Sequence, residues 1–194
     1  MEIRRATPDD AVALAKVHID SWRTAYRGLV PDSHLDGLNY ERRAQRFRES
    51  LAQNAQNPEE TYLAERNREV LGFLTLGGCR DADVDQKTTG EIWGIYLAPG
   101  NWRMGIGTLL CRYGERILEG RGYQSARLWV FAGNGQARRF YEAMGFKPDG
   151  GTKTLNPGAP LEAVRYRKEL REAEPCTPAD CVQPPTSRSS VHTG

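Results

Sequence analysis

The chain has 194 residues, of which 39% are apolar and 27% charged, and its formal net charge is +2. These values suit one globular domain with a sizeable core, and the charge is too mild to indicate nucleic acid binding. No run of about 18 apolar residues could span a membrane. The four cysteines and three histidines are too scattered for a zinc site or a disulfide framework.

The N-terminal segment predicts a strand followed by a helix. Its first ten residues, MEIRRATPDD, lack the apolar stretch of a signal peptide, so we expect a cytoplasmic protein. Residues 2–7 predict the strand, and Pro8 suits the first turn of the helix, which ends before Gly28. One stripe of this helix, at the spacing of a helical face, holds Leu14, His18, Trp22 and Tyr26.

The middle of the chain predicts helical segments, then strands. In chain order we expect a helical turn at 31–38, a charged helix at 40–53, a loop at 54–60, a hairpin of strands at 61–66 and 69–78, and an exposed polar loop at 79–90. Residues 91–99 are apolar nearly throughout, which is typical of a central strand covered on both faces.

The second half alternates strands and helices. We expect a helix at 104–122, a strand at 125–132, a helix at 133–145, a short strand or turn at 146–151, and a last strand at 162–170. Two strand–helix–strand passages predict local parallel pairing, and the hairpins predict antiparallel pairing elsewhere. The predicted fold class is therefore α+β with three α/β/α layers, in which helices cover both faces of a mixed, mostly antiparallel twisted sheet.

Residues 1–170 predict a single domain, followed by a proline-rich C-terminal tail at 171–194. The tail holds four of the eleven prolines and almost no large apolar residues, so we expect it to be disordered. Cys176 and Cys181 both lie in this tail, and their spacing is better explained as accidental than as a pair.

Residues 100–110, GNWRMGIGTLL, place two glycines where a loop becomes a helix. A Walker loop would need a lysine after the glycines, and a dinucleotide fingerprint would need a third glycine where Leu110 stands. A strand, a glycine loop and a helix can instead present backbone N–H groups to a pyrophosphate, and the strand can bind an amide-bearing arm. Coenzyme A is a pyrophosphate joined to such an arm.

Residues 91–110 resemble the acyl-CoA-binding segment of the GNAT family of N-acetyltransferases, whose signature is [Q/R]-x-x-G-x-[G/A]. Residues 134–146, NGQARRFYEAMGF, resemble the second segment of the family, and EAVRYRKEL resembles its closing strand. Trp102 departs from the signature, where Gln or Arg is usual. The contact that a Gln or Arg side chain at this position would make with the pyrophosphate is therefore missing, and Arg103 could replace it.

The resemblance implies a GNAT-like fold and an acetyl-CoA-dependent N-acetyltransferase that uses acetyl-CoA as co-substrate and no metal. The acetyl group would pass to a primary amine by direct attack on the thioester. Small amines, amino acid derivatives, polyamines, antibiotics and protein amines all stay open as acceptors, with no nucleic acid or membrane partner. Dimers are common in the family, so a homodimer is compatible. The alternatives are a non-catalytic acyl-CoA-binding or regulatory module and transfer of a longer acyl chain.

The resemblance also assigns roles to individual residues. Backbone hydrogen bonds to the pantetheine arm and acetyl carbonyl would come from Ile95, Tyr96 and Leu97. The pyrophosphate would be cradled by Arg103, Met104, Gly105, Ile106, Gly107 and Thr108, and Asn134 would cap its helix and reach the coenzyme arm.

Two side chains are predicted to be catalytic. Tyr141 would be the general acid that protonates the leaving thiolate, and Glu91 would deprotonate the incoming ammonium. Trp22 and Tyr26 are predicted to bind the acceptor, because aromatic faces suit a cationic or planar amine. Core packing is the alternative explanation for this aromatic stripe.

Overall fold

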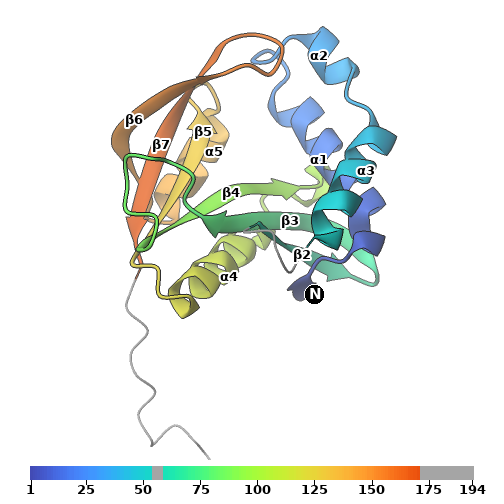
Figure 1. Ribbon diagram of the computed structural model, residues 1–194. Helices are drawn as coiled ribbons and strands as arrows, with labels where there is room; N and C mark the ends of the chain where they lie inside the picture. Colours follow the sequence, from blue (N-terminus) through green and yellow to red (C-terminus); the bar gives the residue numbers. More distant parts are fainter. Residues whose placement is uncertain (54–58, 171–194) are drawn as a thin grey trace, which may run out of the picture.

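The structure is a computed structural model that describes residues 1–53 and 59–170. These residues form one seven-stranded sheet in the order β1-β2-β3-β4-β5-β7-β6 (Figure 1). Its strands are β1 (Glu2–Arg5), β2 (Glu60–Arg66), β3 (Glu69–Gly78), β4 (Thr89–Leu97), β5 (Ser125–Phe131), β6 (Lys147–Leu155) and β7 (Leu161–Glu169). Among the strands of the described residues, only β4 and β5 pair in parallel, so the predicted mixed, mostly antiparallel sheet is confirmed.

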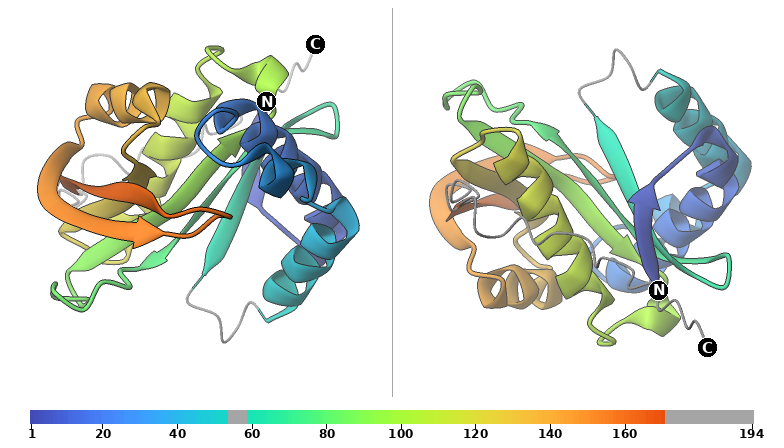
Figure 2. Two further views of the ribbon diagram at one scale, coloured as in Figure 1. Left: turned by 90° about the horizontal axis from the view of Figure 1, so that it is seen from above. Right: turned by 90° about the horizontal axis from the view of Figure 1, so that it is seen from below.

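Helices cover both faces of the sheet, as the three-layer prediction requires. They are α1 (Ala11–Ala25), α2 (Asp32–Asp36), α3 (Tyr40–Ala52), α4 (Ile106–Gly120) and α5 (Gly135–Ala143). Figure 2 shows α1 and α3 on one side of the sheet and α4 on the other. Two apolar cores separate these layers: Leu14, Phe47 and Phe73 belong to one, and Leu74, Leu110 and Tyr166 belong to the other.

Two asparagines fix where helices begin. The side chain of Asn39 accepts a hydrogen bond from the backbone N–H of Arg42 at 2.8 Å, which starts α3. Asn134 accepts from the N–H of Ala137 at 3.0 Å and starts α5, as predicted. An N-terminal cap of this kind satisfies one of the N–H groups that lack a helical partner.

The second parallel passage predicted from the sequence is wrong, because β7 lies between β5 and β6. The strand predicted as short also extends to Leu155. β6 has no fully buried residue and therefore takes the edge, whereas β7 buries Ala163 and Tyr166 and pairs with the whole of β5. Residues 54–58, and the tail with Cys176 and Cys181, lie outside the described residues.

The sheet opens between β4 and β5. These strands pair only at three positions, from Thr89 to Glu91 on β4. Just beyond, β4 has one residue more than β3: Ile92 pairs with Leu76 and Gly94 with Thr75, which leaves Trp93 as a bulge. A bulge bends its strand and re-aims its side chains. The last residues of β4 therefore diverge from β5 and leave part of their backbone without a strand partner on that side.

Candidate active site

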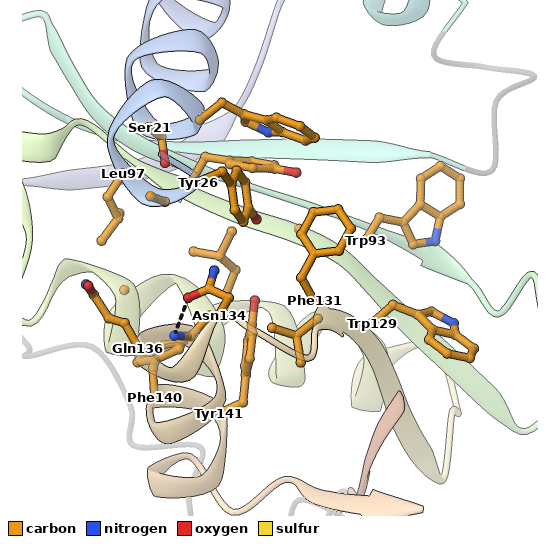
Figure 3. A pocket seen from close by; sticks show the side chains of 18 of the residues that line it. Ser21, Tyr26, Trp93, Leu97, Trp129, Phe131, Asn134, Gln136, Phe140 and Tyr141 are labelled. Carbon is orange, nitrogen blue, oxygen red and sulfur yellow. Dashed lines mark hydrogen bonds between the residues drawn. The ribbon is translucent and has the colours of Figure 1, made fainter. Parts of the chain in front are cut away.

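A cavity of about 850 Å³ fills the opening between β4 and β5. Its walls come from α1, β4, the loop before α4, β5, α5 and the end of β6 (Figure 3). This volume is within the usual range for small-molecule sites, which is roughly 300–1,000 Å³. The cavity thus brings together segments that are far apart in the sequence.

One end of the cavity lies at the N-terminus of α4. The helix begins after Gly105, whose φ of 80° is in the left-handed region that favours glycine, and no side chain caps the helix there. A Cβ on Gly107 would lie 3.4 Å from Leu97 and from Phe140, so the first turn of α4 packs against β4 and α5. The uncapped N–H groups and the positive end of the helix suit a phosphate, which fits a coenzyme A pyrophosphate.

Trp102 fastens this loop to the strand before it. Its indole Nε1 donates a hydrogen bond to the carbonyl oxygen of Leu97 at 3.0 Å, and its side chain lines the cavity. The residue that departs from the family signature therefore holds the end of β4 in place. The carbonyl of Leu97 already has a protein partner, which leaves other backbone groups of β4 to bind a ligand arm.

Tyr141 lies on α5 and lines the cavity with only 7% of its surface exposed. Figure 3 shows its ring rising from α5 toward the side chains of β5 and α1. Burial raises the pKa of the Tyr141 hydroxyl well above its ordinary value of 10.0. The hydroxyl is therefore protonated at neutral pH and can donate a proton or a hydrogen bond.

The side chain of Glu91 lines the cavity and is buried. It is 1% exposed and lies at the start of the opening. Arg80 binds both of its oxygens: Nη2 donates to Oε1 at 2.5 Å, and the backbone N and Nε donate to Oε2 at 3.0 and 3.1 Å. Both carboxylate oxygens of Glu91 are therefore already occupied by donors of Arg80.

The aromatic stripe of α1 serves both packing and the cavity. His18 stacks on Trp22 with ring centroids 5.5 Å apart, Trp22 contacts Tyr26 at 4.8 Å, and Tyr26 contacts Phe131 of β5 at 5.2 Å. Trp22 and Tyr26 both line the cavity. Burial, with Arg43 as a second cause, lowers the pKa of His18 to about 3, so His18 is neutral.

The cavity wall includes most of the residues predicted from the sequence. They are Trp22, Tyr26, Glu91, Ile95, Tyr96, Leu97, Arg103, Gly105, Gly107, Thr108, Asn134 and Tyr141. Two predicted coenzyme residues lie elsewhere: Met104 is 56% exposed, and Ile106 is 2% exposed within the core under α4. The side chain of Met104 faces solvent and that of Ile106 faces the core. Only the backbone groups of these two residues are therefore available to a ligand in the cavity.

Sequence reasoning missed several residues of the opposite end. Arg80, Asp81, Trp93, Trp129 and Lys153 line the cavity there. Arg80 and Asp81 belong to the segment predicted as an exposed loop, and Lys153 to a strand predicted to end earlier. No periodic pattern marks a polar residue whose place depends on a tertiary contact. A sequence signal exists only for Trp93, because the apolar run of residues 91–99 predicts the central strand on which it lies.

Among the residues that the structure describes, no group of His, Cys, Asp and Glu side chains could hold a metal ion. No helix in the same part of the chain is both long and apolar enough to cross a membrane.

Comparison with known proteins gives a consistent result. A family model described as "Acetyltransferase (GNAT) family" matches residues 19–146. The chain is 30% identical over 142 residues to the uncharacterized N-acetyltransferase YuaI of Bacillus subtilis (strain 168), a match that covers 73% of this chain and 77% of that protein.

Solved structures share the fold. The PaiA N-acetyltransferase from Thermoplasma acidophilum, crystallised in complex with coenzyme A, aligns with a TM-score of 0.70 at 21% identity over 87% of this chain and 98% of its own. YncA from Salmonella typhimurium, solved with its cofactor acetyl-CoA, aligns with a TM-score of 0.65 at 19% identity over 93% and 99% of the two chains.

Proposed function

Because the chain belongs to the acetyltransferase (GNAT) family, and is therefore an N-acetyltransferase that uses acetyl-CoA, we propose that it moves the acetyl group directly to a primary amine in the cavity between β4 and β5. One observation carries this proposal. A single cavity runs from the uncapped N-terminus of α4 to the buried, protonated hydroxyl of Tyr141 and on to a second, aromatic end.

The end at α4 is the proposed seat of the coenzyme. Backbone N–H groups from Gly105 to Thr108 bind the pyrophosphate, while the diverging residues of β4 bind the pantetheine arm as an added strand would. The side chain of Asn134 is occupied in capping α5, and its amide nitrogen is the part that can reach the arm. This arrangement directs the thioester into the opening between the strands.

Tyr141 is the proposed general acid. The amine nitrogen attacks the thioester carbonyl carbon, the new C–N bond forms, and the C–S bond breaks with its electron pair on sulfur. The Tyr141 hydroxyl gives its proton to that sulfur, and free coenzyme A leaves as a thiol. The tyrosinate then takes up the second proton that the nitrogen loses as the amide forms. Because the pKa of Tyr141 is raised by burial, the hydroxyl is still protonated when the thiolate forms.

Glu91 is the proposed acceptor of the proton that the attacking ammonium must lose. The carboxylate lines the cavity, but Arg80 holds both of its oxygens, so it acts through water rather than by direct contact. This geometry predicts a smaller contribution from Glu91 than from Tyr141. Cytoplasmic location and a homodimer stay predictions from the sequence and its family resemblance.

Turnover with a panel of amines tests the proposal. Purified protein is incubated with acetyl-CoA and each amine, and the release of free thiol is followed against a control without enzyme. We expect thiol release that depends on both the protein and the amine. If acetyl-CoA raises the melting temperature and no amine yields thiol, the non-catalytic binding module replaces the enzyme as the better account. If acetyl-CoA gives no stabilisation, the assignment of the coenzyme end is wrong.

A further inference from the structure

The end of the cavity away from α4 contains four charged side chains whose partners differ sharply. Figure 3 shows Trp93 and Trp129 at this end, beyond Phe131 from Asn134 and Gln136. The charged residues that line the same cavity and contact these indoles or one another are Arg80, Asp81, Glu91 and Lys153. Their hydrogen bonds decide which charge is available to an acceptor substrate.

Both carboxylates are already covered by protein donors. Arg80 donates three hydrogen bonds to the two oxygens of Glu91. Asp81 accepts from the indole Nε1 of Trp129 at 3.1 and 3.2 Å and from Nη1 of Arg165 at 3.3 Å. An acceptor that carried only positive charge would therefore find no carboxylate without a cationic or indole partner at this end.

The two cationic side chains, Lys153 and Arg80, each have an N–H donor that makes no hydrogen bond to the described residues. Within residues 1–53 and 59–170, the ammonium of Lys153 makes no hydrogen bond and no ion pair, and its contact is with the face of Trp129, 3.8 Å from the ring centroid. Arg80 lies 4.1 Å above the ring of Trp93 and uses its backbone N, Nε and Nη2 on Glu91, while its Nη1 makes no hydrogen bond to the described residues. The indole faces hold both side chains across this end of the cavity.

Burial removes water from around the Lys153 ammonium and so disfavours its charged form. Burial lowers the pKa of Lys153, and the carboxylates of Asp81 and Glu91 only partly offset this effect. An anion beside the ammonium would favour its charged form and supply the hydrogen bonds that it lacks. The same anion would also find the free Nη1 of Arg80.

On the basis of the proposed transferase activity, we propose that the acceptor is an amine that also carries a carboxylate, and that Lys153, with Arg80, binds that carboxylate. The amine would then lie toward Tyr141, and the carboxylate would lie between Trp93 and Trp129. This assignment names amino acids and amino acid derivatives with a free carboxylate as the substrate class. It disfavours polyamines, which have no anionic group.

Matched pairs of substrates test this assignment. Initial rates of thiol release are measured with acetyl-CoA and a panel of α-amino acids and longer amino-carboxylates, each beside its primary amide, together with a linear polyamine. We expect kcat/KM to be at least 10-fold higher for the acid of the best pair than for its amide, because the amide lacks the charge that Lys153 recognises.

Lys153→Met separates this contact from general damage to the fold. Methionine keeps an apolar side chain over Trp129 but removes the charge. We expect kcat/KM for the acid to fall about 10- to 100-fold, mainly through KM, and kcat/KM for the amide to change less than about 2-fold. Lys153→Arg should keep most of the preference. Lys147→Met, on the exposed start of the same strand, is the control and should change neither substrate.

Binding of products gives a readout that does not need turnover. Quenching of tryptophan fluorescence is titrated with the N-acetylated acids and with their amides, in wild type and in Lys153→Met. Binding of the acids that depends on Lys153 supports the carboxylate site even if no amine is acetylated, in which case only the proposed activity fails. Equal kcat/KM for acid and amide, a preference for the polyamine, or equal losses for both members of a pair in Lys153→Met would overturn the assignment.

Discussion

Tyr141 combines deep burial with a hydroxyl that faces a cavity. An ordinary core tyrosine would satisfy its hydroxyl within the core or at the surface, since a buried polar group needs a partner. Here the ring packs against Phe140 and Phe146 at centroid distances of 5.1 and 6.0 Å, and the residue lines the cavity. This apolar packing accounts for the raised pKa of Tyr141, and the hydroxyl is therefore protonated at neutral pH.

Replacement of Tyr141 by phenylalanine removes the proton donor and keeps the ring. We expect kcat to fall about 100-fold or more, since general acid catalysis typically contributes about 10²- to 10⁴-fold. The affinity for acetyl-CoA, measured by its effect on the melting temperature, should stay close to that of wild type. Unchanged turnover in Tyr141→Phe would remove this residue from the mechanism.

His18 links the aromatic stripe to the stability of the protein in acid. Its pKa is lowered from 6.5 to about 3 in the folded state, so below about pH 6.5 the unfolded chain binds a proton that the folded chain does not. The free energy of unfolding should therefore fall as the pH falls from about 6.5 toward 3. The loss due to His18 is on the order of 1 kcal/mol per pH unit.

His18→Phe should remove this part of the pH dependence. Urea unfolding of wild type and variant at pH 7 and pH 5 gives the measurement. Wild type should lose about 1–2 kcal/mol more than the variant over this interval, because the carboxylates titrate equally in both proteins. Equal losses would show that the folded protein protonates His18 as readily as the unfolded chain does.

Among the elements, α5 places a cap and a candidate ligand residue at one position. Asn134 and Asn39 cap their helices in the same way, but only Asn134 lines the cavity. Asn39→Ala and Asn134→Ala should each lower the free energy of unfolding by about 1 kcal/mol. Only Asn134→Ala should also weaken acetyl-CoA binding, by about 3- to 10-fold. Equal coenzyme affinity in the two variants would restrict Asn134 to capping.

The hairpin of β6 and β7 lines the cavity with Lys153, Leu155, Asn156 and Pro157. Its tip reaches α2 in Figure 1, where a Cβ on Gly158 would lie 2.8 Å from Cβ of His34. Gly150 has a similar positive φ, 86° against 81°, with open space around it. Gly150→Ala and Gly158→Ala should both destabilise the protein by about 1 kcal/mol or more through backbone strain. Only Gly158→Ala should raise the KM for the amine, because it alone displaces the tip; an equal KM would contradict this role for the hairpin.

The sequence predicted the helices and strands better than it predicted which strands lie side by side in the sheet. The bounds 69–78 for β3 and the parallel pairing of β4 with β5 are confirmed, since both depend on local patterns. The insertion of β7 beside β5 could not be foreseen, because it depends on which strand of a hairpin buries more apolar surface. Arg80 and Lys153 were also not predicted as site residues. Their positions depend on tertiary contacts with Trp93 and Trp129, which local sequence patterns do not reveal.

At the scale of the whole molecule, two departures from regular strand pairing make the site. The bulge at Trp93 and the short pairing of β4 with β5 open the sheet, α4 and α5 line one side of the opening, and α1 lines the other. The donor and the acceptor would therefore enter the same cavity from opposite ends. Of the cysteines in the described residues, Cys79 and Cys111 are both buried, and Cys111 does not line the cavity. Within the described part of the chain, no cysteine thiol therefore lines the cavity.

Initial-rate kinetics with both substrates varied test this account most directly. Rates are measured over a grid of acetyl-CoA and amine concentrations, and intact mass is recorded after incubation with acetyl-CoA alone. Direct transfer predicts intersecting double-reciprocal lines and an unmodified protein mass, because both substrates must be bound before the bond to sulfur breaks. Parallel lines, with an acetylated protein and free coenzyme A formed before any amine is added, would contradict it.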